Sequence, residues 1–65
     1  MDSKEIDRAM RTCKPVMYEG KRYERIIEYI SWYDKNGKHR LSVVLLQGRA
    51  SYRVPADKVE LANEG

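Results

Sequence analysis

The apolar residues near the start of the chain recur at helical spacing. Ile6, Met10 and Cys13 are three or four residues apart, and charged side chains lie between them. This spacing places the three side chains on one face of an α-helix, opposite a polar face. We therefore predict a helix over residues 3–13, which is too short to persist unless it docks on another part of the protein.

Residues suited to helix ends bound this segment. Asp2 or Ser3 can act as the N-cap, because their short oxygen-bearing side chains accept hydrogen bonds from the free N–H groups of the first turn. Pro15 ends the helix, because it disfavours helical geometry at the preceding residue and has no N–H group of its own.

After Pro15 the apolar positions alternate and are rich in β-branched and aromatic residues, a pattern that favours strands. The predicted strands cover residues 16–18, 23–33, 38–46, 51–54 and 59–61, with one 3₁₀ turn over residues 55–58. Turns are expected at residues 19–20, 34–37 and 47–50, and residues 62–65 are expected to be a frayed tail.

The two longest predicted strands form a hairpin whose register can be checked for consistency. Asn36-Gly37 is typical of a two-residue turn in which both residues have positive φ, and a four-residue turn keeps the same parity. The resulting apolar row pairs Ile30 with Val43 and Trp32 with Leu41, and the mixed row pairs Tyr29 with Val44, Ser31 with Ser42 and Tyr33 with Arg40. Glu28 falls opposite Leu45 on the apolar row, so we expect a bend, a bulge or an arginine partner there.

The inward positions of these elements define a predicted core. It contains Val16, Tyr23, Ile26, Ile30, Trp32, Leu41, Val43, Leu45, Tyr52, Val54, Val59 and Leu61, with Ile6 and Met10 of the helix against one side. Five short strands around so few side chains favour one strongly curved sheet that closes into a small barrel. The expected fold is therefore a mostly β single domain over residues 1–65.

Several strings carry a family resemblance. They are Pro15-Val16-Met17-Tyr18-Glu19-Gly20-Lys21-Arg22-Tyr23, then Ile26, Ile30, Asn36-Gly37, Val43-Val44-Leu45-Leu46, and Val54-Pro55 through Val59-Glu60. Over residues 9–61 the chain resembles small SH3-like barrel proteins carried by conjugative elements and phages of Gram-positive bacteria. The resemblance implies a five-stranded SH3-like barrel with a short N-terminal α-helix and an origin on a mobile genetic element. It implies no activity and no site residues.

The charge of the chain is concentrated in its middle. The formal net charge is +3, and residues 21–53 hold eight basic and three acidic side chains. A basic middle attracts phosphate backbones, although interleaved charges are also typical of a solvated surface. No apolar run reaches the roughly 20 residues of a membrane helix, and the first eight residues lack the apolar run of a signal peptide. We expect a cytoplasmic protein that does not associate with membranes.

The residue types that carry most enzyme chemistry are scarce. One histidine, His39, and one cysteine fall short of the ligands that a zinc site needs, and they give no nucleophile–base arrangement. Glu24 and Glu28 would lie about 13 Å apart on a strand, beyond the roughly 5 to 9.5 Å of glycosidase carboxylate pairs. We therefore predict that the protein is not an enzyme and has no catalytic residues, no cofactor and no metal.

A binding surface is predicted on the non-core face of the hairpin and on the turn and strand beside it. Its residues are Arg25, Ile27, Tyr29, Tyr33, Arg40, Val44, Arg49 and Arg53. Aromatic rings interleaved with arginine suit nucleic acid, because rings stack on bases and guanidinium groups neutralise phosphates. Two other uses of this face remain open: the N-terminal helix covers it through Ile6 and Met10, or a protein partner occupies its apolar part.

These observations predict a non-enzymatic binding module. The first hypothesis is an accessory protein of a mobile genetic element that contacts an unknown protein partner, as a monomer or a weak homo-oligomer. The alternative is a small barrel that binds nucleic acid weakly and with little sequence preference. The two differ in their response to salt, because phosphate contacts weaken steeply as salt rises whereas an apolar interface does not.

Overall fold

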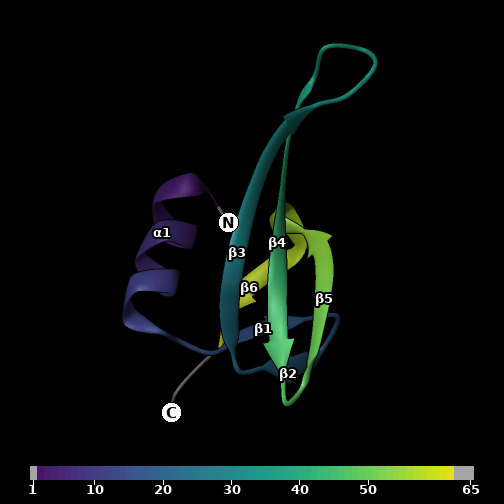
Figure 1. Cartoon of the computed structure of the whole chain (residues 1–65). Helices are drawn as coiled ribbons and strands as arrows, with labels where there is room; N and C mark the ends of the chain where they lie inside the picture. The colour runs from purple at the N-terminus through teal and green to yellow at the C-terminus, as the bar shows by residue number, and fades with distance from the viewer. Residues whose placement is uncertain (1, 63–65) are drawn as a thin grey trace.

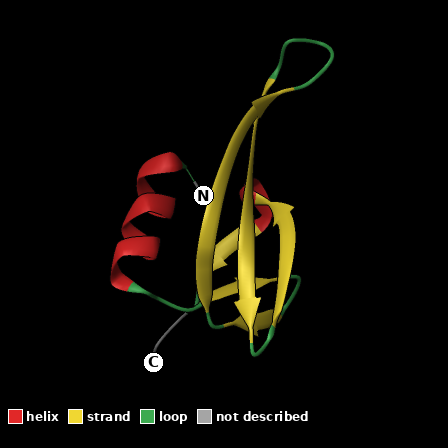
Figure 2. Ribbon diagram, in the orientation of Figure 1, coloured by secondary structure: helices red, strands yellow, loops and turns green. Residues whose placement is uncertain are grey.

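The computed structural model describes residues 2–62, which form antiparallel strands beside one helix (Figures 1 and 2). In chain order the elements are α1 (Ser3–Thr12), β1 (Val16–Tyr18), β2 (Lys21–Tyr23), β3 (Arg25–Tyr33), β4 (His39–Gln47), β5 (Ala50–Pro55), η1 (Ala56–Lys58) and β6 (Val59–Leu61). The mostly β class, the N-terminal helix and the 3₁₀ turn before the last strand are confirmed. The predicted tail at residues 62–65 lies outside the described residues except for Ala62.

Helix α1 is fixed at both ends by hydrogen bonds. Asp2 is the N-cap, and its carboxylate accepts the N–H of Glu5 at 2.8 Å. Cys13 adopts the left-handed conformation with a φ of 52°, and its N–H donates back to the last helical turn. The helix therefore ends one residue earlier than predicted. Cys13 is exposed, and Ala9 takes its predicted place beside Ile6 on the buried face.

The strands form two three-stranded antiparallel sheets, ordered β2-β1-β6 and β3-β4-β5. The predicted strand over residues 23–33 is divided at Glu24, where the chain passes from one sheet to the other. The N–H of Glu24 donates to the carbonyl of Leu46 at 2.9 Å, and its carboxylate accepts the N–H of Gly48 at 3.1 Å. The predicted five-stranded barrel is therefore not confirmed: the described residues form six strands, and neither sheet closes into a barrel.

The β3-β4 hairpin closes through a three-residue loop and not through the predicted two- or four-residue turn. The N–H of Asp34 donates to the carbonyl of Lys38 at 3.0 Å, and the N–H of Gly37 donates to the carbonyl of Asp34 at 2.9 Å. The Asp34 carboxylate also accepts the N–H groups of Asn36 and Lys38. Only Gly37 of the Asn36-Gly37 pair has a positive φ, 77°. This combination is typical of a type I turn followed by a left-handed glycine.

The odd loop length shifts the hairpin by one residue from the predicted register. The observed pairs are Tyr33–His39, Trp32–Arg40, Ser31–Leu41, Ile30–Ser42, Tyr29–Val43 and Glu28–Val44. Because side chains alternate between the two faces of a strand, a shift of one residue moves every side chain of β3 from Glu28 to Tyr33 to the opposite face relative to β4. The predicted apolar and mixed rows are therefore both wrong.

The bulge expected near Glu28 is present. The register of β3 and β4 shifts between Ile26 and Glu28, which leaves Ile27 without a partner on β4. Ile26 consequently faces Leu45 in the core, whereas Glu28 faces Val44. The bulge thus keeps the Glu28 carboxylate away from the buried row.

The core lies between the two sheets and the helix. Its buried hydrophobic residues are Ile6, Ala9, Val16, Tyr23, Ile26, Val43, Leu45, Val54, Ala56 and Val59, and Met10, Tyr18 and Leu41 are partly buried against them. Ala9 and Ala56 are not among the predicted core residues, because alanine gives only a weak hydrophobic signal and is common on surfaces. Helix α1 packs beside β3 and supplies Ile6 and Ala9 (Figure 1).

Four residues predicted for the core lie outside it. Trp32 is 39% exposed, Tyr52 is 44% exposed, Leu61 is 45% exposed, and Ile30 is half-buried outside the core cluster. The register shift turns Trp32 and Ile30 to the side of the sheet away from the core. Tyr52 packs edge-on against Tyr23 with the ring centroids 5.9 Å apart. Leu61 lies on the edge strand β6, which has a neighbour on one side only.

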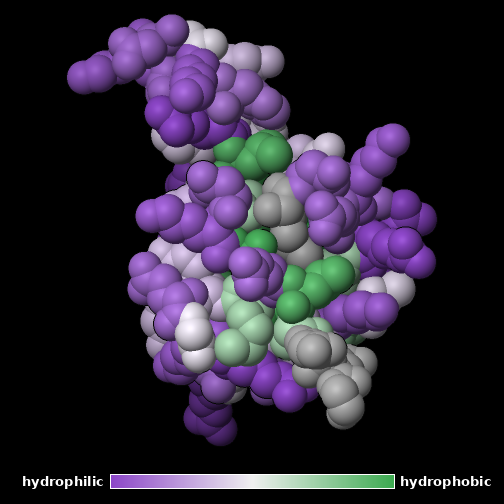
Figure 3. All heavy atoms as spheres, turned by 180° about the vertical axis from the view of Figure 1, so that it is seen from behind, coloured by the Kyte–Doolittle hydropathy of each residue, from purple (hydrophilic) through white to green (hydrophobic). Residues whose placement is uncertain are grey.

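The end of the β3-β4 hairpin extends beyond the rest of the molecule (Figure 1). Strand β5 pairs with β4 only from Ser42 onward, so residues 31–41 form a two-stranded ribbon that we call the arm. Seen from behind, the arm is mainly hydrophilic, and the apolar side chains lie over the middle of the molecule (Figure 3). The arm is therefore an exposed extension of the β3-β4-β5 sheet.

Candidate functional site

One face of the β3-β4-β5 sheet is turned away from the core. Strand pairing aligns Arg25 with Leu46 and Ser51, Glu28 with Val44 and Arg53, Ile30 with Ser42 and Pro55, and Trp32 with Arg40. We call these residues the outer face. The helix and the second sheet pack on the opposite side, where Ile26, Val43 and Leu45 are buried (Figure 1). In the described chain no strand or helix is paired or packed over the outer face, but a terminal nitrogen of Arg25 donates to Sγ of Cys13 at 3.4 Å, and Ser42 is buried beside Trp32.

Arginine dominates the charge of the outer face. Arg25, Arg40 and Arg53 are exposed, and Glu28 is the one carboxylate among the outer-face residues. The row that holds Arg25 and the row that holds Arg40 are seven residues apart along β3, or about 20 Å at the rise of a strand. Positive charge spread over this length suits an extended anionic polymer.

The structure brings together half of the predicted surface. Arg25, Arg40, Val44 and Arg53 lie on the outer face. Tyr29 and Tyr33 lie on the opposite face, because β3 pairs with β4 one residue away from the predicted register. Ile27 sits in the bulge, and Arg49 lies in the turn between β4 and β5. The predicted grouping of tyrosines with arginines on one face is therefore wrong.

Trp32 is the aromatic residue that joins the arginines instead. The sequence holds a signal that places it there: Asp34-Lys35-Asn36-Gly37 has aspartate at the first position and glycine at the fourth, as type I turns prefer. Asn-Gly alone favours the two-residue turn. Weighing Asp34 together with Gly37 predicts the three-residue loop, and that loop aligns Trp32 with Arg40.

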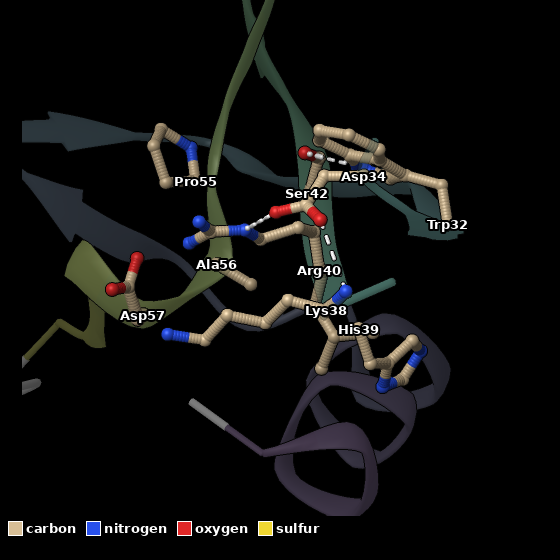
Figure 4. A pocket seen from close by; sticks show the side chains of 10 residues that line it. Trp32, Asp34, Lys38, His39, Arg40, Ser42, Pro55, Ala56 and Asp57 are labelled. Carbon is tan, nitrogen blue, oxygen red and sulfur yellow. Dashed lines mark hydrogen bonds and ion pairs between the residues drawn. The ribbon is translucent and has the colours of Figure 1, made fainter. Parts of the chain in front are cut away.

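A groove of about 650 Å³ lies where the arm meets η1 (Figure 4). Among the residues that line it are Trp32, Lys38, Arg40, Ser42, Pro55 and Asp57. The indole N–H of Trp32 donates to the hydroxyl of Ser42 at 3.3 Å, which ties the ring to β4. In Figure 4 the charged ends of Lys38, Arg40 and Asp57 gather on one side of the groove, and the indole lies on the other.

Asp34 orients the Arg40 side chain. Nε of Arg40 lies 3.0 Å from Oδ2 of Asp34, and the terminal guanidinium nitrogens have no partner within residues 2–62. The N–H of Lys38 lowers the pKa of Asp34 most, and Arg40 and the N–H of Asn36 lower it further. Asp34 is therefore a carboxylate at neutral pH whose acceptors are occupied by the loop and by Nε, while the terminal nitrogens of Arg40 face the groove.

The single histidine lies on the other face of the arm. Nε2 of His39 is 2.5 Å from the Ser31 hydroxyl, and the His39 ring centroid is 5.1 Å from that of Tyr33. In the described part of the chain no carboxylate hydrogen-bonds this imidazole. The contact thus joins the two strands of the arm on the face opposite Trp32.

Residues 2–62 contain no cluster of three His, Cys, Asp or Glu side chains that could hold a metal ion. No helix within these residues is long and apolar enough to cross a membrane. The groups that the outer face offers to a ligand are guanidinium groups, an indole ring and a half-buried apolar row.

Comparison with known protein families, with curated proteins and with solved structures found no match to this chain.

Proposed function

We propose that this chain is a non-enzymatic binding module whose outer face binds nucleic acid with little sequence preference. The observation that carries the proposal is the presence of Trp32, Arg25 and Arg53 on one uncovered sheet face. Guanidinium groups neutralise backbone phosphates, and exposed rings stack on bases whatever the sequence. Surfaces that bind single strands in other proteins combine the same two features, positive groups for the backbone and aromatic rings for the bases.

A protein partner is the second candidate for the same face. Ile30, Val44 and Leu46 are half-buried in the middle of the outer face, and an apolar centre with a charged rim is usual at protein interfaces. The exposed arginines favour an acidic partner. Its affinity would fall less with salt than that of a phosphate backbone, because apolar burial is not screened.

We further propose that the fold is an open relative of the SH3-like plan and that the protein serves a mobile genetic element, as the family resemblance implies. The support is topological: only Glu24 separates β2 from β3, so the two are halves of one bent strand, and η1 precedes the last strand. If β2 and β3 are counted as one bent strand, residues 2–62 form five strands shared between two sheets. Residence in the cytoplasm and a monomeric or weakly associated state stay predictions.

The binding proposal is tested by fluorescence anisotropy with a labelled single-stranded oligonucleotide. Three arginine–phosphate contacts predict a slope of about −2 in log K against log salt concentration, so affinity should fall about 20-fold between about 50 and 200 mM salt. Absence of binding at the lower salt would contradict the nucleic-acid proposal and leave the protein partner as the candidate.

A matched pair of variants locates the interface. The double variant Arg25→Gln/Arg53→Gln should weaken binding and reduce the salt slope by about 1.4, the share of two phosphate contacts. Arg8→Gln/Arg22→Gln removes the same charge from α1 and β2 and should leave that slope unchanged. Equal effects of the two double variants would show that net charge, and not the outer face, determines binding.

A further inference from the structure

Trp32 is tied to the sheet by a hydrogen bond while much of the residue stays accessible. The residue is 39% exposed, and its indole N–H donates to the hydroxyl of Ser42 at 3.3 Å. Ser42 is itself buried in the middle strand of the sheet. A ring fixed in this way loses little conformational freedom when a flat ligand stacks on it.

Two cations lie beside this ring in the same groove. The terminal nitrogens of Arg40 and the ammonium of Lys38 point to one side of the groove (Figure 4), and neither has a partner within residues 2–62. Asp34 is occupied by the loop, so Asp57 is the one groove carboxylate left to oppose them. Asp34 and Asp57 formally balance the two cations, so the match to a nucleotide lies in the arrangement: a flat ring for the base on one side, and for the phosphate on the other two cations whose terminal nitrogens have no hydrogen-bond partner within residues 2–62.

The groove is also open along the arm. The pair Ser42–Pro55 is the last between β4 and β5, so beyond it no strand lies beside β4 on the groove side. Pro55, which has no N–H, forms the corner of the groove with η1. The volume of about 650 Å³ lies within the range of small-ligand sites. An extended strand can therefore lie along the arm and place one residue in the groove.

We propose that this groove binds one unpaired nucleotide, with its base on the indole of Trp32 and its phosphate at Arg40 and Lys38. The inference rests on the proposed function of the outer face and adds the class of nucleic acid, which is single-stranded. In a duplex the bases are already stacked and paired, so none can lie on Trp32 unless the duplex opens. The Asp57 carboxylate faces the same phosphate and opposes binding.

Fluorescence of Trp32, the single tryptophan of the chain, gives a direct test. The probes are a short oligothymidylate, an abasic strand with the same number of phosphates, and a duplex of the same length. The oligothymidylate should quench Trp32 and bind at least about fivefold more tightly than the abasic strand, which is the lower end of base–aromatic stacking. The duplex should leave the fluorescence of Trp32 unchanged.

Four variants, each checked for an unchanged circular dichroism spectrum and melting temperature, sharpen this test. Trp32→Leu should abolish the preference for oligothymidylate over the abasic strand, whereas Trp32→Phe should keep most of it. Tyr33→Leu removes a ring from the opposite face of the arm, where it is 72% exposed, and should change nothing. Asp57→Asn should tighten binding by up to about fivefold, the effect of one unit charge a few ångströms away in water.

The outcomes separate this inference from the proposed function. Equal affinity for the oligothymidylate and the abasic strand, with Trp32 unquenched, would overturn the base pocket and leave phosphate binding by the arginines standing. Tighter binding to the duplex would likewise overturn the pocket. Failure of every probe to bind would overturn both.

Discussion

At the scale of single residues, Asp34 determines how the arm is closed. Its carboxylate accepts the N–H groups of Asn36 and Lys38, and it contacts Nε of Arg40. The N–H of Lys38 is the main cause of its lowered pKa. An unfolded aspartate titrates near about 3.9. Because the folded pKa is the lower of the two, the contribution of Asp34 to stability is present above the unfolded pKa and is lost as the pH falls through the folded pKa.

We predict that the amide resonances of Asn36 and Lys38 titrate together, with a midpoint below about 3.9. Acidification should also lower the amide-exchange protection factors of the arm before those of strands β1 and β6. Two-dimensional NMR spectra recorded across the acid range measure both effects, and the titration should vanish in Asp34→Ala. A midpoint at or above the ordinary aspartate value would show that the loop does not hold this carboxylate.

Single residues also limit what the sequence alone predicts. The N-cap at Asp2 follows from its chemistry and is confirmed. The loop is hard to predict because its residues favour two different turns. Asn36-Gly37 favours a two-residue turn, whereas Asp34 with Gly37 favours a type I turn. The hydrogen bonds that the Asp34 carboxylate accepts from Asn36 and Lys38 decide between them. That one loop moves Trp32 from the predicted core to the outer face.

At the scale of elements, adjacent residues of strand β4 lie on opposite faces of the sheet, one in the core and the next on the outer face. Leu45 faces Ile26 and is fully buried, whereas Leu46 faces Arg25 and is half-buried on the outer face. The alternation is a consequence of the pleat. Local periodicity predicts that neighbouring residues lie on opposite faces, but it does not say which face of β3 meets which face of β4.

We predict that Leu45→Ala lowers the free energy of unfolding by about 2–5 kcal/mol, because it leaves a cavity in the core. Leu46→Ala, the same change one residue along, should cost clearly less, since its side chain is already partly in water. Urea denaturation followed by circular dichroism compares the two. A larger loss for Leu46→Ala would mean that the two faces of β4 are interchanged.

The bend at Glu24 is the element-scale feature that the sequence does not reveal. Residues 23–33 are predicted as one strand, and this run contains no glycine or proline that would indicate a bend. It is held by long-range contacts, in which Glu24 bonds to Leu46 and to Gly48. Local propensity does not report such contacts.

At the scale of the whole molecule, the open arrangement of the two sheets determines which surfaces are available. The predicted closed barrel leaves its entire outside available, whereas two sheets with a helix beside β3 leave the outer face of β3-β4-β5 and the arm among the exposed surfaces. The arginines of that face follow from composition and strand spacing. Their grouping with Trp32 does not, because it depends on a register that a three-residue loop sets.

The central claim is that Trp32 shares the outer face with the arginines, and the hairpin register tests it most directly. Asp34 and Lys38 form a hydrogen-bonded pair, and the two kinds of pair alternate along the hairpin. Ser31–Leu41 and Tyr29–Val43 are therefore of the closer, non-hydrogen-bonded kind, with Cα atoms about 4.5 Å apart. We predict strong Hα–Hα nuclear Overhauser effects between Ser31 and Leu41 and between Tyr29 and Val43. Strong effects between Trp32 and Leu41 would instead return Trp32 to the core side and contradict the account.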